Sequence, residues 1–223
     1  MEVPVGEVRV VGDVPAAFAE LVVLEAPRSI ALSGGGTAEA CYLALAGRAA
    51  EVDWRSVTVL FGDERWVPSD DPASNEGMAR RALLDHVDPA AVHSMASAAA
   101  DIGDAARAYA EVVAAFAPID LVHLGLGPDG HTASLFPGSP ALEEHLALVV
   151  ATGDDLHPHP RLTLSLPGIA GSRLAVVTVE GADKAQAWAR LCGGDDVPAA
   201  RITAERVVWL VDRTAAAGTP ELA

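Results

Sequence analysis

The sequence predicts a single α/β domain over residues 1–223, built on an open, mostly parallel sheet with helices on both faces. Three observations support this prediction. Short apolar runs alternate with segments of helical periodicity, as in repeated strand–helix units. Hydrophobic residues make up 51% and charged residues 21% of the chain, which is ample for a packed core. Several apolar runs end directly in glycine or charged residues, at the edge where open parallel sheets bind ligands.

The expected elements follow from the apolar pattern, taken in chain order. The predicted strands are 8–11, 29–32, 57–61, 120–126, 148–151, 161–166, 173–179 and 207–211, and the predicted helices are 14–24, 38–50, 76–86, 101–116, 140–146 and one that opens at 181–184. Asp13 and Ser74 precede two of these helices and are expected to cap them. The run 161–166 alternates polar and apolar residues, so we expect a strand that is half exposed to a cleft or to solvent. No linker, repeat or low-complexity tract divides the chain.

The net charge restricts the class of partner. A formal charge of -16 argues against nucleic acid and anionic membranes, since both require a basic surface. No segment approaches the roughly 18 apolar residues of a membrane span, and the first residues lack the order of a signal peptide. Cys41 and Cys192 have no CxxC or CxxH spacing, which fits a reduced cytoplasm and provides no metal or disulfide framework. We therefore expect a cytoplasmic protein.

The stretch 120–137 carries the strongest chemical signal. Its buried strand runs into Gly125, Gly127 and Gly130, which indicates a tight turn with close backbone approach. The turn presents Asp129 and His131. Imidazole changes charge near neutral pH, so His131 is the best candidate for a general base. The alternative is a turn histidine that only caps backbone groups.

A second glycine turn follows the predicted strand 29–32. Its residues are Ser33, Gly34, Gly35, Gly36 and Thr37, directly before a helix. Free amides at a helix N-terminus hold phosphate in this arrangement, and the two hydroxyl side chains can add donors. The simpler alternative is a tight βα turn. The loop is not a Walker A sequence, because no Gly-Lys-Ser/Thr follows.

Four charged side chains complete the set of candidates. Asp63 and Arg65 follow the strand 57–61, where Asp63 can position a hydroxyl or water and Arg65 can pair with phosphate; the alternative is a solvated charge cluster. Arg161 opens a strand. Lys184 is the only lysine among 15 Lys and Arg residues. It is expected in the first turn of a helix, where a cation opposes the helix dipole unless an anion binds beside it; chance retention is the alternative.

Other motifs are weak. Residues 125–130 match GxGxxG, but Pro128 lies inside the turn, no long helix opens after it, and no acidic residue ends a second strand about 20 residues later. No GxSxG or SxxK motif is present for a serine nucleophile. Asp129 and His131 alone are too few for a zinc site.

These motifs, in this order, resemble the 6-phosphogluconolactonases, within the wider group that includes glucosamine-6-phosphate deaminases. The resemblance runs from about residue 29 to residue 212 and rests on the segments 32–37, 62–68 with 74–75, 125–137, 161–164 and 181–184. It implies a Rossmann-like α/β fold, no metal or organic cofactor, and hydrolysis of 6-phospho-D-glucono-1,5-lactone to 6-phosphogluconate in the pentose phosphate pathway.

The resemblance also implies roles. His131 would take a proton from the attacking water, and Asp129 or Asp63 would orient His131 or the sugar hydroxyls. Arg65, Arg161, Lys184 and the amides of residues 33–37 would hold the phosphate. The partner is then a small sugar phosphate lactone, with the chain a monomer or weak homodimer.

Two rival functions remain open. The deaminase resembles this chain at Asp63, Asp129 and His131, but deaminases usually carry a glutamate where this chain has Phe136. An apolar residue cannot act as the acid that ring opening needs. A sugar-phosphate sensor is the other rival, although the short acidic N-terminal segment has no room for a DNA-binding helix-turn-helix.

Overall fold

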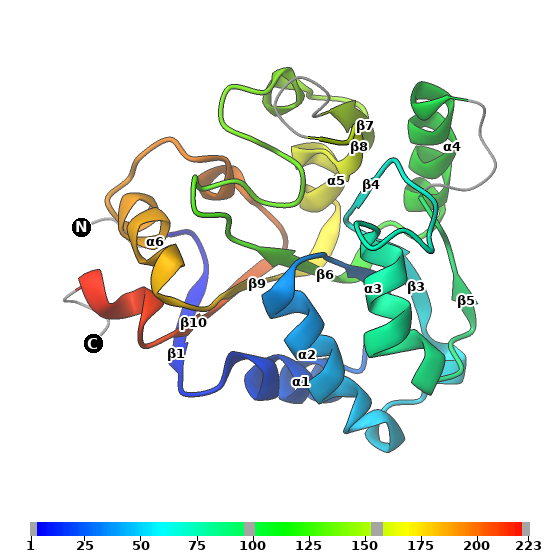
Figure 1. Cartoon of the computed structure of the whole chain (residues 1–223), viewed down its shortest axis with the longest axis horizontal. Helices are drawn as coiled ribbons and strands as arrows, with labels where there is room; N and C mark the ends of the chain where they lie inside the picture. Colours follow the sequence, from blue (N-terminus) through cyan, green and yellow to red (C-terminus); the bar gives the residue numbers. More distant parts are fainter. Residues whose placement is uncertain (1–3, 96–100, 153–157, 220–223) are drawn as a thin grey trace.

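A seven-stranded sheet forms the centre of the computed structural model, which describes residues 4–95, 101–152 and 158–219 (Figure 1). The strand order is β1-β10-β9-β6-β2-β3-β5, and all the printed pairs are parallel. The strands are β1 (Glu7–Val11), β2 (Ser29–Leu32), β3 (Thr58–Phe61), β5 (Ala91–Val92), β6 (Ile119–Gly125), β9 (Ser172–Val179) and β10 (Arg206–Asp212). The predicted fold class is confirmed.

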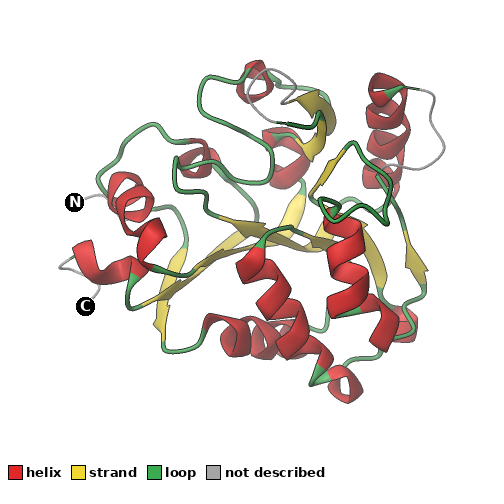
Figure 2. Ribbon diagram, viewed as in Figure 1, coloured by secondary structure: helices red, strands yellow, loops and turns green. Residues whose placement is uncertain are grey.

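Helices cover both faces of this sheet (Figures 1 and 2). They are α1 (Val14–Glu25), α2 (Gly36–Ala46), α3 (Asn75–Ala82), α4 (Ile102–Ala115), α5 (Leu166–Ala170) and α6 (Ala185–Cys192). In the view of Figure 1, α1, α2 and α3 lie together below the sheet, and α4 and α5 lie above it. At one edge α6 packs on β10, where the Trp188 and Trp209 rings lie 5.7 Å apart. None of the helices in the described part of the chain is both long enough and apolar enough to cross a bilayer.

The predicted caps are confirmed, while several helix ends are corrected. The Asp13 carboxylate accepts from the Ala16 amide at 2.9 Å, and the Ser74 hydroxyl accepts from the Gly77 amide at 2.9 Å. The predicted helix 38–50 begins earlier, at Gly36, and ends at Ala46. The predicted helix 76–86 breaks at Leu83 into α3 and a short 3-10 turn. The predicted helix 140–146 is a single 3-10 turn, Pro140–Glu143.

A second, antiparallel sheet stands above the first and was not predicted. It consists of β4 (Asp63–Arg65), β8 (Arg161–Leu164) and β7 (Val149–Thr152), in the order β4-β8-β7. The prediction of a half-exposed strand 161–166 is wrong, because β8 is the middle strand and even Thr163 is 0% exposed. The strand also ends earlier than predicted, since Ser165 caps α5 through a 3.1 Å bond to the Gly168 amide.

The side of the sheet on which the chain adds its next strand changes between β2 and β6, two adjacent parallel strands at the middle of the large sheet. From β2 the chain crosses to β3 on one side, whereas from β6 it crosses to β9 on the other. Such a topological switch point opens a crevice beyond the carboxyl ends of the strands, where open α/β sheets bind ligands. The turn after β2 starts at Ser33 and the turn after β6 starts at Leu126, so both glycine turns meet there.

Candidate active site

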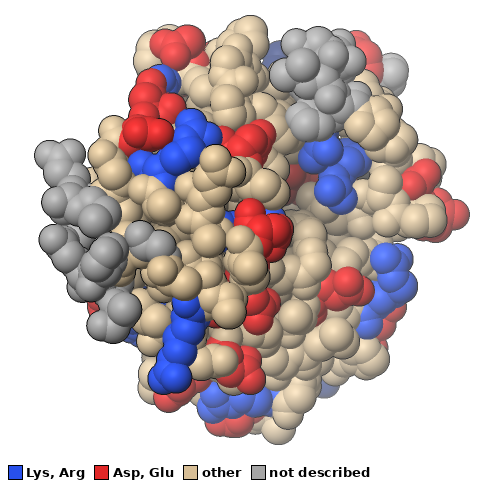
Figure 3. Space-filling model, turned by 60° about the vertical axis from the view of Figure 1, so that its left-hand side comes forward, with Lys and Arg blue, Asp and Glu red and all other residues tan. Residues whose placement is uncertain are grey.

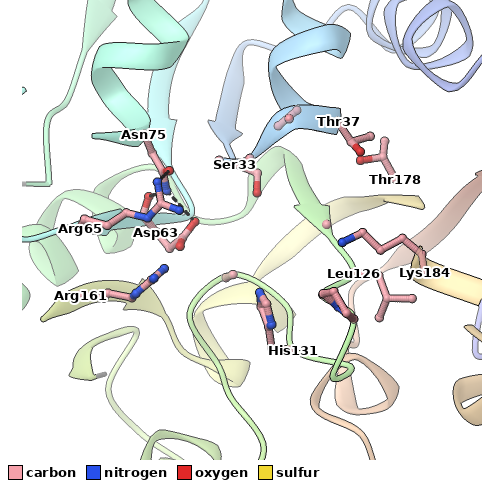
Figure 4. Close-up of a pocket in the computed structure, with 18 residues that line it drawn as sticks. Ser33, Thr37, Asp63, Arg65, Asn75, Leu126, His131, Arg161, Thr178 and Lys184 are labelled. Atoms are coloured by element: carbon pink, nitrogen blue, oxygen red, sulfur yellow. Dashed lines mark hydrogen bonds between the residues drawn. The ribbon is translucent and has the colours of Figure 1, made fainter. Parts of the chain in front are cut away.

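A pocket lies at this switch point and gathers residues from distant parts of the sequence (Figure 4). It contains every predicted site residue except Asp129. Its lining is Ser33, Gly34, Gly35, Gly36, Thr37, Ala38, Asp63, Arg65, Asn75, Gly125, Leu126, Gly127, Pro128, His131, Ala133, Arg161, Thr178 and Lys184. The two sheets and both glycine turns therefore converge on one site.

The turn after β6 brings His131 into this pocket (Figure 4). Its imidazole points between two walls of side chains, one with Asp63, Arg65 and Arg161 and the other with Thr37, Thr178 and Lys184. The turn closes through a hydrogen bond from the Gly127 amide to the His131 carbonyl oxygen at 2.8 Å. A Cβ atom on Gly127 would lie only 2.0 Å from His131 Nδ1. Glycine is thus required at position 127 because the histidine ring occupies the space of a side chain.

Asp129 does not line the pocket, but it binds His131, the candidate general base. Its Oδ1 atom accepts from the His131 amide at 3.0 Å and lies 2.5 Å from His131 Nδ1. Partial burial by itself raises the pKa of Asp129, but these hydrogen bonds and the nearby imidazole outweigh it and hold the pKa below its ordinary value. With Nδ1 bonded to the carboxylate, Nε2 is the ring nitrogen left to act on a ligand.

Asp63 lies in a buried hydrogen-bond network on the wall that also holds Arg65 and Arg161. Its Oδ2 accepts from the Ser134 hydroxyl at 2.6 Å, and its Oδ1 accepts from the Asn75 amide group at 3.2 Å. The sequence left open whether Asp129 or Asp63 orients His131. In the structure Asp129 makes that contact, while Asp63 faces the pocket with Ser134 and Asn75 as its partners.

Arg65 and Arg161 stand directly opposite each other on the paired strands β4 and β8. Arg65 donates to the Asn75 side chain at 2.7 Å and to the Ala73 carbonyl oxygen at 2.8 Å. Burial, followed by the charge of Arg65, lowers the pKa of Arg161. Like charges facing each other across strands are destabilising unless negative groups offset them. Here Asp63 and the buried Glu64 provide that offset.

Phe136 connects the arginine wall to His131. Its ring lies 4.7 Å from the imidazole, and the Arg161 guanidinium carbon lies 5.3 Å from the centre of the Phe136 ring. With only 3% of its surface exposed, Phe136 packs as a wedge that fixes both neighbours. Position 136, where the sequence comparison led us to expect a glutamate in a deaminase, is filled by an apolar ring.

The glycine loop before α2 combines local and ligand requirements. Gly34 lies against Asn75 of α3, whose Oδ1 would be 1.9 Å from an added Cβ. Gly35 has a φ of +92°, which favours glycine, so neither residue needs a ligand to explain it. Gly36 is different, because it has no positive φ and an added Cβ would meet nothing within 4 Å. Gly36 and Thr37, the first residues of α2, line the pocket, so the N-terminus of this helix is placed where it can receive an anion.

Lys184 ends a single 3-10 turn, Ala182–Lys184, directly before α6, rather than lying within the first turn of that helix as predicted. Its ammonium lies 3.1 Å from Asp183, and its side chain is 20% exposed. Figure 4 shows Lys184 with Thr37 and Thr178 on one side of His131, and Arg65, Arg161 and Asp63 on the other. The cations therefore form two groups, one on each wall.

Sequence reasoning missed several polar residues of the site. Asn75, Ser134 and Thr178 contact or line the pocket but received no role. Glu64 was also missed: its carboxylate accepts from the Ser74 hydroxyl and from the amides of Asn75 and Glu76, at 2.7 to 2.9 Å. This bond set anchors β4 on the N-terminus of α3 and thereby positions Arg65 and Asn75. The available signal was the pair of Ser74, at the capping position, and the adjacent Asn75.

Away from the pocket, most arginine side chains in the described part of the chain pair with acidic residues. Arg201 pairs with Asp196 and Glu143, and Arg190 pairs with Asp195. On the face drawn in Figure 3, Lys and Arg occur in small groups beside Asp and Glu. Within the described residues, no group of three or more His, Cys, Asp or Glu is arranged to hold a metal ion.

The fold and the site together define an α/β enzyme that acts on a small anionic ligand. Comparison with known proteins specifies the family. The family model described as glucosamine-6-phosphate isomerases/6-phosphogluconolactonase matches residues 9–209. The chain belongs to this family.

Individual relatives agree with this family assignment. The chain is 44% identical over 209 residues to the 6-phosphogluconolactonase of Mycobacterium tuberculosis, covering 86% of this chain and 85% of that protein. It is 41% identical over 202 residues to the 6-phosphogluconolactonase of Synechocystis, covering 84% and 82%. The solved 6-phosphogluconolactonase structure from Trypanosoma brucei superimposes with a TM-score of 0.80 at 27% identity, covering 97% and 99% of the two chains. The predicted resemblance is confirmed.

Proposed function

We propose that the chain hydrolyses 6-phospho-D-glucono-1,5-lactone to 6-phosphogluconate, the second step of the oxidative pentose phosphate pathway. The observation that carries this proposal is the carboxylate-bound imidazole standing between two cationic walls of one pocket. Lactone hydrolysis needs a base for the attacking water and an anchor for a phosphorylated substrate. The names of relatives at 44% and 41% identity agree with this reaction.

In this mechanism His131 Nε2 takes a proton as water adds to the lactone carbonyl carbon. Asp129 keeps Nδ1 protonated and stabilises the imidazolium that forms. The tetrahedral intermediate collapses with cleavage of the bond between the carbonyl carbon and the ring oxygen. The imidazolium returns its proton to that oxygen, and the new carboxylic acid ionises. General-base assistance of this kind contributes about 10²–10⁴-fold.

The phosphate lies against the turn 33–37 and Lys184. This wall combines helix N-terminal amides with an ammonium whose paired carboxylate, Asp183, is 65% exposed and therefore well hydrated. On the opposite wall, Asp63 and Glu64 already offset the charges of Arg65 and Arg161. That wall suits the sugar hydroxyls and the lactone oxygen atoms better than a phosphate dianion.

The deaminase function has less support. Ring opening of an amino sugar needs an acid near the histidine, and the apolar Phe136 ring lies 4.7 Å from His131. The sensor function has no observation in its favour. We therefore place one hydrolytic activity in this pocket.

The enzyme is proposed to work in the cytoplasm as a monomer or weak homodimer. Cys41 and Cys192 are both free and buried, as expected for a chain that folds without disulfides. Light scattering after size-exclusion chromatography measures the assembly state directly.

The decisive assay supplies freshly prepared 6-phosphogluconolactone and follows acid release above the spontaneous rate. Glucosamine 6-phosphate, with ammonia release as the readout, is the parallel substrate. The proposal requires enzyme-dependent acid release and no ammonia. Ammonia release without lactone hydrolysis would establish the deaminase instead, and binding without turnover of either substrate would establish a sensor.

A further inference from the structure

Three buried polar side chains form a hydrogen-bonded chain beneath the pocket. Tyr42 from α2 lies with its hydroxyl 2.9 Å from His123 Nδ1, and His123 Nε2 on β6 lies 3.0 Å from Thr178 Oγ1 on β9. Tyr42 and His123 are fully buried, and Thr178 is 3% exposed. Burying polar groups costs free energy, and hydrogen bonds within a connected network offset that cost. A fully paired network of this kind fixes the orientation of its members.

We propose that Thr178 is a phosphate-binding hydroxyl and that His123 is a positioning residue that directs the Thr178 hydrogen into the pocket. This inference rests on the proposed function, because it adds a contact to the same substrate site. It gives a role to a buried histidine that the reaction itself does not use.

The location of Thr178 supports the first part. Thr178 lies near the carboxyl end of β9, paired with Gly125 at the end of β6, and it lines the pocket. Figure 4 shows its side chain beside Thr37 and on the same wall as Lys184. A hydroxyl beside the glycine loop and the only lysine is positioned to donate to the same anion.

The hydrogen count supports the second part. Burial lowers the pKa of His123 to about 3, so the ring is uncharged at neutral pH and carries one N–H. When Nε2 carries the hydrogen, His123 donates to Thr178 Oγ1. The Thr178 hydrogen is then available to the pocket, because its alternative acceptor, the Leu124 carbonyl oxygen, is 3.4 Å away.

The other tautomer gives the opposite result. With the hydrogen on Nδ1, His123 donates to the Tyr42 oxygen and accepts from Thr178, which then presents only lone pairs to the pocket. A phosphate oxygen is an acceptor and would be repelled by those lone pairs. Bound phosphate therefore selects the tautomer with hydrogen on Nε2.

Tyr42 links the same chain to the glycine loop. Its oxygen accepts from the Ser33 amide at 2.6 Å, and its hydrogen can go either to His123 Nδ1 or to the Ser33 carbonyl oxygen at 3.1 Å. In the tautomer that phosphate selects, the Tyr42 hydrogen is donated to His123. One buried chain thus holds both Ser33 and Thr178, which line the same pocket.

The test compares Thr178→Val, which keeps the shape of the side chain but removes its hydroxyl, with Thr178→Ser, which restores the hydroxyl. Thr58→Val removes a threonine hydroxyl from β3, outside the residues that line the pocket, and is the matched control. The measurements are KM and kcat with the lactone, and calorimetric affinity for inorganic phosphate and for 6-phosphogluconate. Nitrogen-15 spectra of labelled histidine, with His123→Gln to assign the signal, report the His123 tautomer.

We expect Thr178→Val to weaken phosphate binding and to raise KM about tenfold or more, because one hydrogen bond to a charged group is lost. The value of kcat is expected to change less than about twofold. Thr178→Ser restores most of the affinity, and Thr58→Val matches the wild type. His123→Leu weakens phosphate binding in the same direction. The phosphate complex shows hydrogen on Nε2 of His123.

Unchanged phosphate affinity in Thr178→Val, or hydrogen on Nδ1 of His123 in the phosphate complex, would overturn the inference. Its failure is separable from failure of the proposed function, because the binding and spectroscopic measurements require no turnover. A wild-type protein that binds phosphate but leaves the lactone intact contradicts the function alone. A wild-type protein that hydrolyses the lactone, with a Thr178→Val variant that binds phosphate normally, contradicts the inference alone.

Discussion

Asp129 and His131 are two residues apart on one turn, and Asp129 Oδ1 lies 2.5 Å from His131 Nδ1 while also accepting from the His131 amide. The carboxylate therefore fixes the imidazole through its ring and its backbone together. This bond decides which ring nitrogen faces the ligand, and it depends on a turn that only glycine at position 127 permits.

Replacing Asp129 by Asn tests the orienting role. The change keeps the size of the side chain but removes the charge that stabilises the imidazolium, so kcat is expected to fall about tenfold or more with KM nearly unchanged. Steady-state kinetics with the lactone at neutral pH provide the measurement. Asp53→Asn, at an exposed position, is the control. Full activity in Asp129→Asn would remove the carboxylate from the mechanism.

Replacing Lys184 by Ala tests the phosphate wall. We expect KM for 6-phosphogluconolactone to rise about tenfold or more, because an interaction with a charged phosphate is lost, while kcat changes little. Unphosphorylated glucono-1,5-lactone should show no such rise. Arg55→Ala, whose side chain is 83% exposed, serves as the control for lost positive charge. An equal effect on both lactones would contradict the assignment.

Replacing Gly127 by Ala tests the packing that places His131. An added Cβ would lie 2.0 Å from His131 Nδ1, so the ring has to move out of position. A displacement of about 1 Å can cost about 10²-fold in rate, and kcat is expected to fall by that order. Gly12→Ala is the control, since an added Cβ there meets nothing within 4 Å. Equal rates for the two variants would show that the ring adapts.

His123 makes folding sensitive to acid. Burial lowers its pKa from 6.5 to about 3 in the folded protein, whereas the unfolded chain keeps the ordinary value. The unfolded chain therefore binds the proton first as pH falls. The contribution to stability is complete above the unfolded pKa and is lost below it, by about 1.4 kcal/mol for each pH unit, until the folded pKa is reached.

Urea unfolding between pH 7 and pH 5 measures this effect. His123→Leu is expected to flatten the dependence of the unfolding free energy on pH, because the group that takes up the proton is gone. His86→Gln, at an exposed position, should keep the wild-type slope. If His123→Leu had the same slope as the wild type, acid sensitivity would arise elsewhere in the chain.

The strands and glycine turns could be predicted because they are local. The apolar runs of β2, β3, β6, β9 and β10 need both faces covered, and a glycine after a buried strand indicates a tight turn whatever lies nearby. The turn that presents Asp129 and His131 is local as well, although the sequence left open whether Asp129 or Asp63 orients the imidazole. These features depend on neighbours in the chain.

The small sheet and its contacts could not be predicted, because they depend on distant pairing. β4 has three charged residues and no apolar alternation, and it becomes a strand only by pairing with β8, nearly 100 residues later. The same holds for Ser134, which reaches Asp63 across 71 positions, and for Thr178, which reaches His123 across 55. Gly34 illustrates the limit: its need for glycine comes from Asn75 on another helix.

The central claim is that His131 removes the proton from the attacking water, and the kinetics of His131→Ala on 6-phosphogluconolactone at neutral pH test it most directly. After the spontaneous rate is subtracted, the account predicts that kcat falls by about 10²–10⁴-fold. The affinity of the variant for inorganic phosphate is expected to be preserved. Near wild-type turnover by a folded His131→Ala enzyme would contradict it.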